Sequence, residues 1–159
     1  MPLPQRKRMR LPDYDYSLNG AYFVTICTHN KANLFGRTEE RSLAHRVIDH
    51  AFQETLADFP SVRCPKYVIM PNHFHGIIML EDQYGNQDLR QFIQVFKSKS
   101  TVIYGQYVKR GYLPPFEQKI WQRSFYDHII RNERDYLEIW QYIENNPRKW
   151  DLDRYYTHE

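Results

Sequence analysis

Two histidines, His73 and His75, are separated by a single residue in the segment Pro-Asn-His-Phe-His-Gly at positions 71–76. The residues that follow are mostly apolar, which indicates a buried strand. Because residues i and i+2 of a strand point to the same face, the two imidazoles would project side by side. Neutral imidazole is the commonest metal ligand in proteins. A lone His-x-His is more often ordinary packing, so the pair indicates a metal site only together with further ligands.

A second pair, Tyr142 and Asn146, lies about seventy residues later in a segment with helical patterning. Residues four apart on a helix lie on one side of it, about 6 Å apart along the axis. The phenol is a candidate nucleophile, and the amide oxygen is a candidate metal ligand. Each has a structural alternative, since any of the thirteen tyrosines can be a core residue and an Asn before Pro147 can end a helix. Tyr136 is the nearest rival nucleophile, but it is turned away from Asn146.

Hydrophobic spacing predicts the elements that must position these residues. Alternating and β-branched runs indicate strands, and apolar residues three and four apart indicate helices. Asn132 is expected to cap the last helix, and Gly105 is a candidate break in the second. In chain order the expected elements are a strand at Ala21–Thr28, a helix between Glu39 and Phe59, strands at Tyr67–Met70 and His73–Leu80, a helix at Leu89–Val108, a strand at Ile120–Ile130 and a helix from Glu133 to about Asn145.

This order predicts an α+β fold of the ferredoxin-like type, a split βαβ arrangement with an antiparallel sheet and a helix added at the C-terminal end. Two helices would cover one face of the sheet. The other face would carry His73 and His75 and would be crossed by the last helix. The fold therefore predicts that Tyr142 and Asn146 lie over the histidine pair.

Length and composition indicate one domain, which we assign to residues 18–159, because 159 residues that are 42% hydrophobic suffice for a single core. Residues 1–17 are expected to form a basic arm, either solvated or in contact with phosphates. The net charge of +3 permits an anionic partner without requiring one. The arm owes its charge to Arg6, Lys7, Arg8 and Arg10.

The two cysteines, Cys27 and Cys64, have no paired metal-binding spacing, which argues against a zinc finger or a disulfide scaffold. The N-terminal segment has no apolar run of the length that a signal peptide or a membrane helix requires. We therefore expect a cytoplasmic protein that does not interact with membranes.

The sequence resembles the single-tyrosine HUH transposases and, among them, the transposases associated with repetitive extragenic palindromic elements. The resemblance extends from about Leu11 to Asp153, and the segment Gly20–Asn30 resembles the opening strand of the family. It rests mainly on Pro-Asn-His-Phe-His-Gly at 71–76, Trp-Gln-Arg-Ser-Phe-Tyr-Asp-His-Ile-Ile-Arg-Asn at 121–132 and Tyr-Ile-Glu-Asn-Asn-Pro at 142–147.

The resemblance implies that His73, His75 and Asn146 bind a divalent cation, Mg²⁺ or Mn²⁺. It also implies that Tyr142 cuts single-stranded DNA and forms a 5′-phosphotyrosine linkage. The partner would be single-stranded or hairpin DNA at the foot of a palindrome. Members of the family act as monomers or as homodimers that exchange the tyrosine helix, and the sequence does not choose between these states.

Four basic residues are candidates for DNA contacts: Arg123, Arg131, Lys97 and Lys99. For the two lysines the alternative is a helix that covers the sheet with its ammonium groups in water. His128, which follows Asp127, is expected to be a structural residue or a further DNA contact.

Other classes of enzyme fit less well. Two-histidine phosphoesterases need a pair of His-x-Thr/Ser motifs, and cupin metal sites need a carboxylate closer to the histidines than Glu81. A domesticated protein that binds or regulates hairpin DNA without transposition remains the alternative, and metal-dependent cleavage separates the two.

Overall fold

The computed structural model describes residues 20–81, 88–153 and 155–157. The basic arm assigned to residues 1–17 lies outside these ranges. Within them, the chain forms a four-stranded antiparallel sheet with the strand order β2-β3-β1-β4. The strands are β1 (Gly20–Cys27), β2 (Val62–Met70), β3 (His73–Leu80) and β4 (Tyr126–Ile130).

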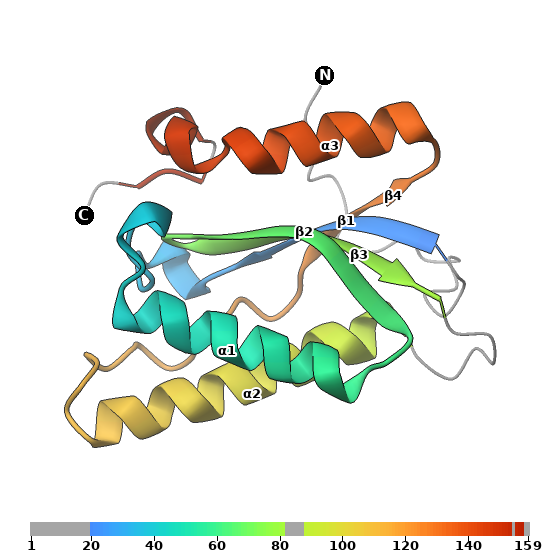
Figure 1. Ribbon diagram of the computed structural model, residues 1–159. Helices are drawn as coiled ribbons and strands as arrows, with labels where there is room; N and C mark the ends of the chain where they lie inside the picture. Colours follow the sequence, from blue (N-terminus) through green and yellow to red (C-terminus); the bar gives the residue numbers. More distant parts are fainter. Residues whose placement is uncertain (1–19, 82–87, 154, 158–159) are drawn as a thin grey trace.

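Helices α1 (Leu43–Asp58) and α2 (Leu89–Lys109) connect the strands on one face of the sheet, and α3 (Glu133–Asn145) lies across the other (Figure 1). Strands β1 and β2 are parallel with β3 between them, and β3 and β4 are parallel with β1 between them. This is the ferredoxin-like split βαβ topology. The fold predicted from the sequence is confirmed.

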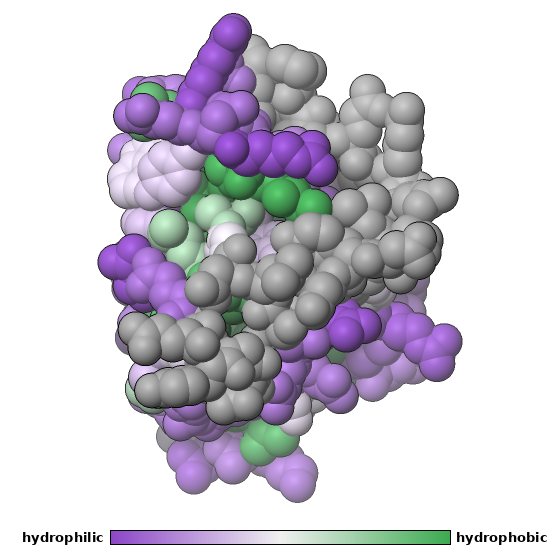
Figure 2. All heavy atoms as spheres, turned by 90° about the vertical axis from the view of Figure 1, so that its right-hand side faces the viewer, coloured by the Kyte–Doolittle hydropathy of each residue, from purple (hydrophilic) through white to green (hydrophobic). Residues whose placement is uncertain are grey.

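The sheet separates two hydrophobic layers, and β3 contributes to both because successive residues of a strand point to opposite faces. Phe74, Ile78 and Leu80 belong to the larger core beneath α1 and α2, whereas Ile77 belongs to the smaller core beneath α3. The end-on view in Figure 2 shows hydrophilic residues above and below, with hydrophobic residues visible between them. The smaller core consists of Phe23, Val68, Met70, Ile77, Ile139, Ile143 and Trp150.

None of the described helices is long and apolar enough to cross a bilayer.

Two predicted strand starts and one candidate helix break were wrong. β2 begins at Val62 rather than Tyr67, because a bulge between Arg63 and Lys66 lets the polar half of the strand keep pairing with β3. β4 begins at Tyr126 rather than Ile120, and of the predicted residues before it Trp121 keeps only an isolated antiparallel bridge to Thr28. Helix α2 continues through Gly105, since glycine costs a helix only about 1 kcal/mol.

Helix α3 is held against the sheet at both ends. At its start, Asn132 Oδ1 accepts the N–H of Asp135 at 2.8 Å, which confirms the predicted cap, and Asp135 lies 2.9 Å from His128 Nε2 on β4. Near its end, Glu144 pairs with Lys66 on β2. Lys66 holds the pKa of Glu144 below its ordinary value. The contact between His128 and Asp135 joins β4 to α3, so His128 has a structural role.

Gly76 on β3 is expected to be intolerant of a side chain. A Cβ there would lie 2.8 Å from Cε1 of Phe74 and 3.3 Å from Cβ of Tyr67. Overpacking of this kind costs about 1–3 kcal/mol, so Gly76→Ala should lower the free energy of unfolding by that amount in urea titrations. The matched control is Gly105→Ala in α2, where no atom lies within 4 Å of the added Cβ. There the substitution should stabilise by about 0.5–1 kcal/mol. Equal stability of the two variants would contradict the packing described for β3.

Candidate metal and nucleophile site

His73 and His75 open β3, a central strand, on the face that α3 covers. Their side chains are buried, with 0% and 1% exposure, and their ring centroids lie 4.4 Å apart. The two imidazoles are therefore neighbours on one face, as their spacing in the sequence predicts.

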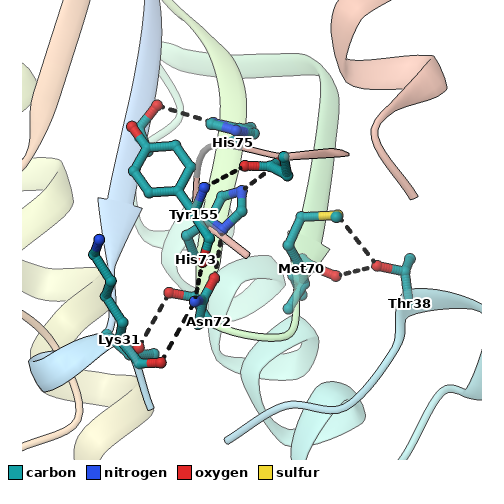
Figure 3. Close-up of polar contacts among 11 residues, drawn as sticks. Lys31, Thr38, Met70, Asn72, His73, His75 and Tyr155 are labelled. Atoms are coloured by element: carbon teal, nitrogen blue, oxygen red, sulfur yellow. Dashed lines mark hydrogen bonds and ion pairs between the residues drawn. The ribbon is translucent and has the colours of Figure 1, made fainter. Parts of the chain in front are cut away.

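Asn72 determines which nitrogen of His73 carries the proton. Its amide Nδ2 donates to the backbone carbonyl of Tyr155 at 2.6 Å, which orients the carboxamide and turns Oδ1 toward His73 Nδ1 at 2.8 Å (Figure 3). Because an amide oxygen only accepts hydrogen bonds, His73 Nδ1 must be the donor. Nε2 of the neutral ring then carries the lone pair, which is the form in which histidine binds a metal.

His75 is fixed through the same ring position. Its Nδ1 lies 2.9 Å from the hydroxyl of Thr25, its cross-strand partner on β1. Both histidines are thus held through Nδ1, so Nε2 is the atom through which each would bind a metal. Outer hydrogen bonds of this kind orient the ligands of metal sites.

Asp153 joins the pair from beyond α3. Its Oδ2 lies 3.8 Å from His73 Nε2, and its side chain is 1% exposed. Ligand atoms of His73, His75 and Asp153 all lie within 4.8 Å of one another. Asp153 was not predicted as a ligand, because no periodicity or motif in the sequence indicates where the chain runs after Pro147.

Asn146 ends α3 and lies one helical turn after Tyr142. Its side chain is 4% exposed, and its Oδ1 is buried without a hydrogen-bond partner among the described residues. A desolvated amide oxygen of this kind costs about 1–3 kcal/mol, a cost that a nearby cation would offset. The alternative that Asn146 caps the helix also holds, since it is the C-cap residue, although its backbone is right-handed rather than αL.

The available donors fit a divalent cation. Two imidazoles, a carboxylate and an amide oxygen combine the nitrogen ligands that transition metals accept with the oxygen ligands that Mg²⁺ and Mn²⁺ prefer. His73, His75, Asp153 and Asn146 would supply them, and the first three already have their ligand atoms within 4.8 Å of one another.

Tyr142 faces this cluster from α3 in the same chain. Its ring centroid lies 5.5 Å from that of His75 and 5.9 Å from that of Phe23, which it contacts edge to face. The rival Tyr136 instead contacts Trp140. A single chain therefore brings the tyrosine helix to the histidine pair without a contribution from a partner chain.

The two candidate lysines lie on α2, on the opposite face of the sheet. Lys97 Nζ donates to the carbonyls of Gln122 and Ser124 at 2.8 and 2.9 Å. Lys99 pairs with Asp58 at 2.9 Å, and this hydrogen bond raises the pKa of Lys99. The structure therefore does not bring either lysine to the histidine pair and gives both of them structural partners.

The two candidate arginines remain predictions as DNA contacts. Arg123 lines a pocket of about 300 Å³ together with Arg90 and Lys97. Arg131 is exposed immediately before α3. Neither arginine is part of the histidine cluster.

Comparison with known proteins places this arrangement in a family. The sequence pattern described as "Transposase IS200 like" matches residues 17–146. The chain belongs to the IS200-like transposase family. An uncharacterized protein of Haemophilus influenzae is 36% identical to this IS200-like protein over 169 residues, covering 96% of this chain and 93% of the relative.

Two further comparisons concern REP-associated tyrosine transposases. One from Escherichia coli K12 is 29% identical over 134 residues, covering 84% of this chain and 70% of the relative. The solved structure of a REP-associated tyrosine transposase bound to a REP hairpin superposes with a TM-score of 0.63 at 24% identity, covering 88% of this chain and 73% of that one. At this identity the structural likeness establishes the fold of the IS200-like protein.

Proposed function

We propose that this protein is a metal-dependent endonuclease and strand transferase that acts on single-stranded DNA at the foot of a hairpin. The observation that carries the proposal is the position of Tyr142 against His75, in one chain, beside a buried set of metal-ligating groups. The hairpin substrate is supported by the relative whose structure is described as bound to a REP hairpin.

The metal would be Mg²⁺ or Mn²⁺, held by His73, His75 and Asn146. When bound, such a cation polarises a phosphate and stabilises the charge that develops on it. The chain itself provides rigidity, because Asn72 and Thr25 hold the two imidazoles in fixed orientations.

Tyr142 would be the nucleophile. Its phenolic oxygen attacks phosphorus as its proton leaves, and the bond from phosphorus to the 3′ oxygen breaks. That oxygen departs with the electron pair and takes up a proton, which gives a 3′-hydroxyl and a 5′-phosphotyrosine. Attack on this linkage by another 3′-hydroxyl restores the phenol and rejoins DNA, so strand transfer needs no external energy source.

Tyr155 lies over the histidine pair. Tyr155 packs against both histidines, with ring centroids 4.5 Å from His73 and 5.8 Å from His75, and both histidine side chains are almost fully buried.

The test is cleavage of a labelled DNA hairpin with single-stranded flanks. We expect cleavage with Mg²⁺ or Mn²⁺ and none with EDTA, with the 5′ end retained on protein in denaturing gels. Binding of the hairpin without cleavage under all metal conditions would instead support the alternative, a domesticated hairpin-binding regulator. A hairpin whose stem is scrambled on one side is the matched control substrate.

A further inference from the structure

We propose that Asp153 is a direct ligand of the divalent cation and that metal binding thereby fastens the chain at Asp153 onto the sheet. This inference rests on the proposed metal site. It adds a ligand from outside the histidine strand and the tyrosine helix, and it gives the segment after α3 a role in holding the metal.

The separation of the two ligand atoms supports a shared ion. The distance of 3.8 Å between Asp153 Oδ2 and His73 Nε2 is too long for a hydrogen bond. Two ligands that each lie about 2.1 Å from one octahedral ion are separated by roughly 3.0 Å when adjacent and by roughly 4.2 Å when opposite. The observed separation falls in this range.

The burial of the Asp153 carboxylate also favours a bound cation. The Asp153 side chain is 1% exposed, and burying a carboxylate is costly unless a cation compensates it. With the proton of the neutral His73 ring on Nδ1, the ligand atom is Nε2, which lies 3.8 Å from Asp153 Oδ2. The Oδ1 of Asn146 is likewise buried and has no hydrogen-bond partner among the described residues.

The chain on either side of Asp153 positions its carboxylate near His73. The 3₁₀ helix η3 (Pro147–Leu152) follows α3 and buries Trp150, whose ring centroid lies 6.1 Å from that of His73. Asp153 Oδ1 then accepts the N–H of Tyr155 at 2.8 Å, which directs Oδ2 toward the histidine. The carbonyl of Tyr155 in turn accepts the bond from Asn72 that orients His73. One network thus positions both ligands.

The experiment measures Mn²⁺ binding to the DNA-free protein by titration calorimetry. Asp153→Ala and Asp153→Asn should each weaken Mn²⁺ affinity by roughly tenfold or more and reduce the rise in Tm that saturating Mn²⁺ produces. The control is Asp151→Asn, two residues earlier, where an exposed carboxylate pairs with Arg37. It should leave Mn²⁺ affinity within about twofold of wild type.

The Asn variant keeps the size of the side chain and an acceptor for the Tyr155 N–H, so it remains informative if the Ala variant does not fold. Wild-type Mn²⁺ affinity in Asp153→Asn, with an unchanged circular dichroism spectrum, would overturn this inference alone. Failure of the wild-type protein to bind Mn²⁺ at all would overturn the proposed metal site as well.

Discussion

Tyr142→Phe is expected to abolish the covalent DNA adduct and to lower hairpin cleavage by roughly 10³-fold or more, because it removes the only atom that would form the bond to phosphorus. The ring contacts with His75 and Phe23 involve carbon atoms and survive the substitution. The variant should therefore fold normally and bind Mn²⁺ with wild-type affinity. Adduct formation is measured on denaturing gels with a labelled hairpin.

The matched control is Tyr136→Phe, on the same helix but in contact with Trp140 instead of the histidines. It should cleave within about twofold of wild type. An adduct that persisted in Tyr142→Phe would assign the nucleophile to another residue, whereas loss of the adduct in both variants would indicate a defect in the helix.

His73→Ala and His75→Ala are expected to weaken Mn²⁺ affinity by roughly 100-fold or more and to reduce cleavage to the level seen with EDTA. Both rings are held through Nδ1 by neighbouring side chains, so each presents Nε2 as a ligand, and removing a ligand costs more than the 10–100-fold typical of its outer partners. Calorimetry and the gel assay measure the two effects separately.

The control for these variants is His50→Ala, an exposed histidine on α1 that pairs with Glu54. It should change neither metal affinity nor cleavage. Full metal-dependent cleavage by either His73→Ala or His75→Ala would remove the basis for the metal site, and a circular dichroism spectrum shows whether each variant is folded.

The sequence predicted those parts of the site that depend on local periodicity. The two-residue spacing of His73 and His75 fixes their common face once β3 forms, and the four-residue spacing of Tyr142 and Asn146 fixes theirs once α3 forms. The apolar residues Ile139 and Ile143 decide which side of α3 meets the sheet. Such spacings can be interpreted from the sequence alone because strands and helices have fixed periods.

The parts that could not be predicted depend on long-range contacts. Asp153 reaches His73 across 80 positions of sequence because η3 turns the chain back over the sheet, and no local signal encodes that path. Asn72 reads as a turn residue, yet its hydrogen bond to Tyr155 spans 83 positions. Lys97 reads as a surface lysine, but tertiary structure brings two carbonyls to its ammonium group.

The most direct test of the central claim is mass spectrometry of the protein after reaction with a short hairpin in Mn²⁺. The wild-type protein should carry a nucleotide fragment on the peptide that contains Tyr142, and the modified tyrosine should be identified by fragmentation. A protein that cleaves the hairpin without any covalent nucleotide, or that carries it on a different tyrosine, would contradict the proposed site.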